Sequence, residues 1–197
     1  MGSTWMVVLA WLVVLALWGA AVYNRLRLLR NRVENAWSQI DVQLKRRHDL
    51  IPNLVEVARG YMQHEASTLE AVARARSQAV QASEALRGHT GQAQALGALA
   101  AAEQALGSSL GRLMVVAEAY PELKADAQMQ SLSEEIASTE NRIGFARQAY
   151  NDEVMAFNNK ASQFPDLIWA RLLGFAHMDM LQSTMNEQER QAPSVRF

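Results

Sequence analysis

The chain has 197 residues, half of them hydrophobic, and its 19 lysines and arginines nearly balance its 20 aspartates and glutamates, for a formal net charge of -1. This near neutrality excludes a general nucleic-acid binder, because such proteins need a broad basic surface to neutralise phosphates. The absence of cysteine excludes disulfides, thiol catalysis and cysteine metal sites, and is compatible with a reducing cytoplasm.

The first predicted element is a membrane-spanning helix at the N-terminus. No charged side chain precedes Arg25, and residues 5–23 form an apolar run. At about 1.5 Å per residue, such a helix spans roughly the 30 Å hydrocarbon core of a bilayer. We therefore predict a short extracytoplasmic N-terminus at residues 1–4 and an anchor at residues 5–23. Its aromatic residues are expected to mark the anchor: Trp5 and Tyr23 lie at its two ends, in the headgroup region, and Trp11 and Trp18 lie deeper, where they contact either lipid or another helix.

The cations after this run predict its orientation. Positively charged flanks are retained on the cytoplasmic side, so the N-terminus is expected outside and the bulk of the chain in the cytoplasm. A cleaved secretory signal is the competing interpretation, but it needs a basic segment before the apolar run, and residues 1–4 have none. Four arginines near the membrane are expected to contact anionic lipid: Arg25, Arg27, Arg30 and Arg32.

Helical periodicity continues beyond the anchor. Apolar residues from Val33 to Val72 recur mostly in steps of three and four, which predicts one long helix. Pro52 should kink or break it near residues 49–51, and we favour a kink because the periodicity resumes in phase. Residues 83–92 combine small and polar side chains with two glycines, and predict the turn to a second helix that ends before Pro121.

The first of these helices carries a second basic cluster, at residues 45–48. The cluster comprises Lys45, Arg46, Arg47 and His48, and we interpret it as a solvated helix face. The alternative is a lipid-facing stripe, which would require the helix to lie down on the membrane, because an upright helix holds these residues beyond the Debye length.

The third predicted helix has the most regular pattern of the chain. Apolar residues from Met129 to Phe164 repeat in nearly unbroken threes and fours, a coiled-coil-like seam that Pro165 ends. Since no alternating β pattern occurs, the predicted fold class is all-α. We expect an N-terminal transmembrane helix, then an elongated antiparallel bundle of three long helices plus a short C-terminal helix over residues 24–182, and a tail at residues 183–197.

Catalytic and metal-binding motifs are missing from the sequence. His64 and Glu65 open an HExx pair, but the fifth position is Thr68 instead of a second histidine, so a zinc protease site is absent. No phosphate-binding loop occurs either. We expect no catalytic residue, no metal and no cofactor. The remaining enzymatic interpretation is a site formed between subunits, lined by one histidine and three glutamates: His48, Glu134, Glu135 and Glu140.

Two groups of residues are candidates for a subunit interface. Asn141, Asn151 and Asn158 lie at or beside the seam, where amides set helix register, either within one chain or between chains. The apolar segment 167–181 either caps the end of the bundle, which we favour, or folds back beside the bilayer as a membrane contact or subunit interface. Its interface candidates are Trp169, Leu172 and Phe175.

Several motifs resemble the signature of the LemA family. The strongest match is YNRLRLLRNRVENAWSQIDVQLKRRHDLIPNLVEVARGYMQHE at residues 23–65. Others are AEAYPELKAD at 117–126, TENRIGFARQAYNDEVMAFN at 139–158, FP at 164–165 and APSVRF at 192–197, while residues 78–105 fit least well. The resemblance implies an N-terminal transmembrane helix with a short outside N-terminus and a helical-bundle domain. It leaves the molecular function open.

These features together favour a structural role over catalysis. We expect a single-pass protein of the bacterial inner membrane that is not an enzyme and acts as a homo-oligomeric scaffold, with the lipid bilayer and its own copies as partners and no nucleic acid. The alternative is a membrane-tethered adaptor that uses the bundle surface to bind a membrane protease, an envelope-stress component or a signalling protein.

Overall fold

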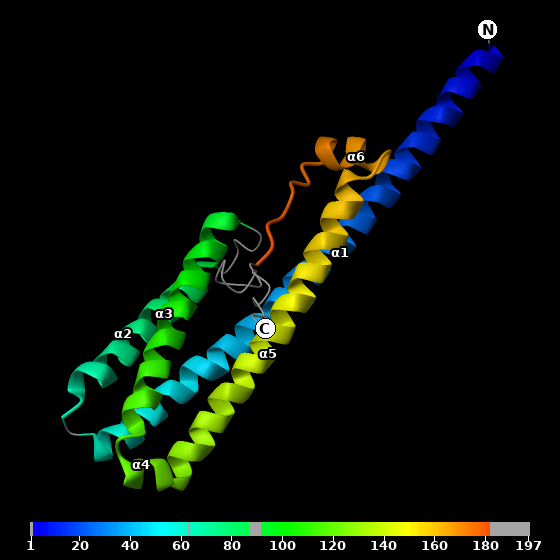
Figure 1. Cartoon of the computed structure of the whole chain (residues 1–197). Coiled ribbons are helices and arrows are strands. Elements are labelled where there is room, and N and C mark those ends of the chain that lie inside the picture. The colour runs from blue at the N-terminus through cyan, green and yellow to red at the C-terminus, as the bar shows by residue number, and fades with distance from the viewer. Residues whose placement is uncertain (1, 63, 87–91, 182–197) are drawn as a thin grey trace, which may run out of the picture.

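A computed structural model describes residues 2–62, 64–86 and 92–181, and within them every regular element is an α-helix (Figure 1). The all-α fold class is therefore confirmed. The predicted tail at 183–197 and the closing APSVRF motif lie outside the described residues. The helices are α1 (Gly2–Tyr61), α2 (Ala66–Leu86), α3 (Ala93–Ala117), α4 (Pro121–Ala125), α5 (Ala127–Ser162) and α6 (Asp166–Leu172).

The longest element is α1, which runs for 60 residues from the apolar N-terminus into the bundle without interruption. The prediction that one helix continues to Val72 is wrong, because α1 ends at Tyr61 and a short connection precedes α2. Pro52 lies inside α1 and leaves it helical on both sides. The bundle consequently has four long helices where three were predicted.

The helices pack as two antiparallel pairs (Figure 1). α5 lies along α1, α2 lies along α3, and α2 also contacts α1. In the described part of the chain, α3 and α5 do not pack along their lengths. α4 closes the end far from the N-terminus, and α6 lies beside α1 at the opposite end of the bundle.

The apolar seam predicted for the third helix is confirmed as the buried face of α5. Met129, Ile143 and Phe157 are among its buried residues, and Tyr150 packs edge-on against Trp37 of α1 at 6.0 Å between ring centroids. The seam therefore packs against helices of the same chain. Its predicted last residue, Phe164, is 82% exposed because the helix has already ended at Ser162.

Local signals explain where α4 and α5 begin. Pro121 occupies the first turn of α4, where its missing N–H costs no hydrogen bond. Asp126 caps α5, and its carboxylate accepts a hydrogen bond from the Met129 amide at 2.9 Å. The pKa of Asp126 lies below its usual value, first because of this backbone hydrogen bond.

Candidate functional site

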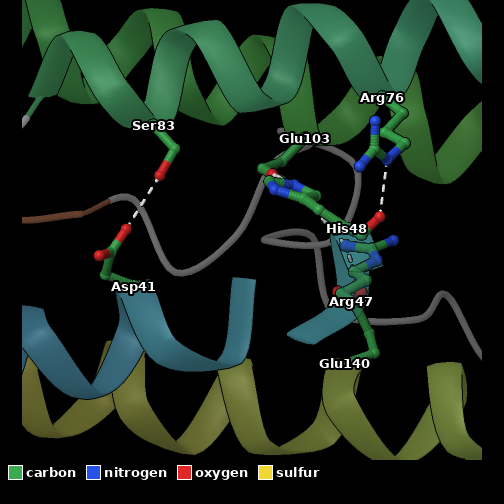
Figure 2. A network of polar contacts seen from close by, with 7 residues as sticks. All are labelled: Asp41, Arg47, His48, Arg76, Ser83, Glu103 and Glu140. Carbon is green, nitrogen blue, oxygen red and sulfur yellow. Dashed lines mark hydrogen bonds and ion pairs between the residues drawn. The ribbon is translucent and has the colours of Figure 1, made fainter. Parts of the chain in front are cut away.

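A buried ionic cluster joins three helices in the middle of the bundle. Arg47 and His48 of α1 are 5% and 4% exposed, and Glu103 of α3 is 3% exposed. Glu103 accepts a hydrogen bond from Arg47 Nη1 at 3.1 Å, and its other oxygen lies 2.7 Å from His48 Nε2. Arg47 also pairs with the half-exposed Glu140 of α5 at 2.7 Å. Figure 2 shows these side chains converging from α1, α3 and α5.

A second contact in the same region ties α2 to α1. Arg76 Nε of α2 donates a hydrogen bond to the backbone oxygen of His48 at 2.6 Å (Figure 2). That oxygen would normally accept from the amide of residue 52, four positions later, but Pro52 has no N–H to donate. Arg76 therefore satisfies the carbonyl that Pro52 leaves without its helical partner, which explains why α1 continues past a proline.

The interpretation of residues 45–48 as a solvated face holds for only half of the cluster. Lys45 and Arg46 are exposed and pair with Asp49 and Glu135, but Arg47 and His48 are in the core. Their position in the apolar register was available, because they lie three and four residues after buried Leu44. The residue that sequence reasoning missed is Glu103, which lies in register between Leu99 and Leu106 of α3.

The arrangement of this cluster suits a structural role, in which ion pairs and hydrogen bonds hold α1, α3 and α5 together. Its charges are nearly all buried and paired with one another, no nucleophile belongs to it, and its one exposed member, Glu140, faces a groove between α3 and α5. The groove holds about 470 Å³, and small residues of α3, Gly107 and Gly111, form part of its wall. Among the described residues, no group of three or more histidines and carboxylates could hold a metal ion.

Two asparagines of α5 clamp an extended segment of the chain. Asn158 accepts from the Met178 amide at 3.0 Å and donates to the Met178 carbonyl at 2.8 Å. Asn151, seven residues earlier, makes the same pair of bonds to Leu181, each at 2.8 Å. Each amide side chain thus bonds both backbone groups of one residue, as a neighbouring strand would. Of the three predicted interface asparagines, only Asn141 remains exposed, and its predicted position at or beside the seam is wrong, because it lies two residues from Ile143 and therefore on the opposite side of α5.

The segment after α5 folds back against the N-terminal helix. Trp169 packs edge-on against Trp18 at 6.1 Å, and Phe175 contacts both Tyr23 and Phe157. The favoured prediction that segment 167–181 caps the bundle core is confirmed for Leu181, which is buried, and for Phe175 and Met178, which pack against the core, but it is wrong for Leu172, which is 74% exposed. The alternative, in which this segment contacts the membrane or a second copy, stays a prediction.

The N-terminal part of α1 has the exposure of a membrane-facing helix. It is the single described helix that is long and apolar enough to cross a bilayer, and little of its apolar stretch is buried in the bundle. Trp5 and Trp11 are exposed, whereas Trp18 is half-buried by Trp169. The four arginines at positions 25, 27, 30 and 32 all face solvent, where Arg30 pairs with Glu34.

Comparison with known proteins extends these observations. The family model described as LemA family matches residues 36–197. Two curated relatives, the magnetosome proteins MamQ 1 and MamQ 2 of Paramagnetospirillum magneticum, are each 26% identical over 175 residues, which is 81% of this chain and 64% of the relative. Magnetosome protein MamQ of Magnetospirillum gryphiswaldense is 24% identical over 172 residues, covering 80% and 63%. The chain thus spans less than two thirds of the length of these relatives.

Proposed function

Because this chain belongs to the LemA family, we propose that it acts as a membrane-anchored structural protein that self-associates at the bacterial inner membrane. The observation that carries the proposal is the continuity of α1, which is helical from the candidate membrane span to the far end of the bundle. A continuous helix couples the position of the anchor to that of the bundle. The role we propose is non-enzymatic, with the N-terminus outside and the bundle in the cytoplasm.

The outer face of α5 supports self-association. Phe145 is 74% exposed and Met155 is 48% exposed, on the side of the helix opposite the seam. Asn141 lies four residues before Phe145, and in helical register the three residues share one outward face. An exposed apolar face that includes an amide is suited to pairing with an identical face, because the amide favours one register.

The mass of the full-length protein in mild detergent tests this proposal. Light scattering should give a discrete multiple of 21.9 kDa, and Phe145→Glu should reduce it toward the monomer. The matched control is Val115→Glu, which alters an equally exposed apolar residue on α3 and should leave the mass unchanged. A monodisperse monomer for the unaltered chain would refute self-association.

Orientation has its own test, since the chain has no native cysteine. A single thiol at exposed Ser138 should react with a membrane-impermeant reagent only after cells are permeabilised. Labelling in intact cells would overturn the cytoplasmic placement of the bundle.

The groove between α3 and α5 favours the second candidate function, a membrane-tethered adaptor. It opens beside Glu140 and is lined by short side chains such as Ser133 and Ala137, which leave room for side chains of a partner. Replacement of Ala137 by tryptophan should fill the groove. Under the adaptor hypothesis this change abolishes partner co-purification and leaves the mass of the chain itself unchanged, whereas the scaffold hypothesis predicts no loss of bound proteins.

A further inference from the structure

The region around α6 presents apolar side chains to the outside of the bundle. Ile168 and Leu172 are four residues apart and therefore lie on one face of α6, with exposed fractions of 58% and 74%. Phe164, just before the helix, is 82% exposed. Scattered apolar residues are common on protein surfaces, but large side chains gathered on one short helix indicate a contact with another apolar phase.

The charges of this region leave the apolar face free of acidic groups. Asp166 is the one acidic residue of α6, and it is 7% exposed. Its carboxylate pairs with Lys160 Nζ of α5 at 2.5 Å. The exposed charge of α6 is the cation Arg171. An exposed face that combines large apolar residues with a cation suits the surface of an anionic bilayer.

Contacts with α1 set the depth of α6 relative to the anchor. The Trp169 indole lies so close to Gly19 that a Cβ there would be 3.0 Å from the ring. Gly19 and the neighbouring Trp18 precede Tyr23, the last residue of the apolar run, by four and five residues. At about 1.5 Å per residue this places α6 roughly 6–8 Å inside the predicted end of the span.

We propose that α6 is a second membrane contact, lying in the headgroup and outer acyl region of the leaflet that α1 leaves toward the bundle. This inference rests on the proposed anchoring of the chain through α1. The lipid bilayer is the expected occupant because α6 packs against the apolar part of α1, whose side chains Leu12 and Leu15 are themselves exposed. Two contacts instead of one fix both the tilt of the bundle and its rotation about α1.

Site-directed spin labelling of the full-length chain tests this proposal. Because the sequence has no cysteine, single thiols at Ile168 and Leu172 can each carry one nitroxide in vesicles of phosphatidylethanolamine and phosphatidylglycerol. Exposed Val115 on α3 serves as the aqueous control position, because it lies outside the proposed self-association face, and Leu12 serves as the control position in the anchor. Each label is measured for collisions with oxygen, which concentrates in lipid, and with a water-soluble nickel chelate.

The expected result is a ratio of oxygen to nickel accessibility at residues 168 and 172 that is several-fold higher than at 115 and lower than at 12. Ratios equal to that at 115 would overturn the proposal. Protection from both reagents together with spin–spin broadening would also overturn it, because a second copy would then cover α6. A low ratio at residue 12 would instead refute the anchoring of α1, so the two failures are distinguishable.

Discussion

Arg76 donates to the His48 carbonyl, which Pro52 leaves without its helical partner, so the effects of replacing Arg76 and Pro52 on stability should be coupled. Arg76→Ala removes a charged donor from the His48 oxygen at 2.6 Å, and His48 is 4% exposed. Losing a hydrogen bond to a charged group costs about 1.5–3 kcal/mol of folding free energy. In a Pro52→Ala background, the amide of residue 52 donates to the same oxygen, so Arg76→Ala should cost less than about 1 kcal/mol. The expected coupling energy is therefore about 1–2 kcal/mol.

The assay is urea unfolding of the full-length protein in mild detergent, with far-UV circular dichroism as the signal that monitors loss of helix. Urea is preferable to guanidinium because it leaves the ion pairs unscreened. The matched control is Arg74→Ala, since Arg74 also lies on α2 but pairs only with exposed Glu70, and it should cost at most about 0.5 kcal/mol in either background. Equal costs of Arg76→Ala with and without Pro52, within about 0.5 kcal/mol, would refute this account of α1.

Three further predictions concern the buried polar groups. Glu103→Ala should cost about 3–5 kcal/mol because it leaves two buried bases poorly paired, whereas Glu140→Ala, at a half-exposed position, should cost about 1 kcal/mol or less in the same unfolding assay. Asn158→Ala should accelerate hydrogen exchange at the Met178 amide, and Asn159→Ala, which changes an exposed neighbour, should leave it unchanged. Burial, with a smaller contribution from the Asp179 charge, raises the pKa of Tyr150 from 10.0 to about 12. The unfolded state therefore loses this proton first, and the free energy of unfolding should fall as pH rises from 10 toward 12. The Tyr150→Phe variant, which has no such proton, should not show this fall.

The buried ionic cluster and the asparagine clamp serve a common purpose. The two helix pairs are joined by the packing of α2 on α1, but α3 does not pack along α5, and in the middle of the bundle the polar contacts of Arg47 add a link from α3 to α1 and α5. Closer to the apolar end of α1, the clamped segment 178–181 links α5 to α3. Asn151 of α5 bonds its backbone, and its Asp179 accepts a hydrogen bond from the Ala93 amide of α3. The separation of α3 from α5 thus accounts for both features.

Much of the candidate site was present in the sequence without being recognisable as a site. Asn151 and Asn158 are seven residues apart on one helix face, which indicates a shared partner but not whether that partner is a second copy or another segment of the same chain. The structure resolves this choice for both side chains, since each bonds the backbone of segment 178–181. Asn141 and the outer face of α5 remain candidates for contacts between copies.

Periodicity and proline are local properties of the chain, and they were enough to predict the helical class, the candidate span, the buried face of α5, and the helix ends near Pro121 and Pro165. Which helices pair, why α1 passes Pro52 and how Glu103 comes to neutralise Arg47 depend on packing in three dimensions. The physical reason is that an amphipathic helix specifies a face to bury and not the element that covers it. A charge in the apolar register can be recognised as paired only when its partner is known in space.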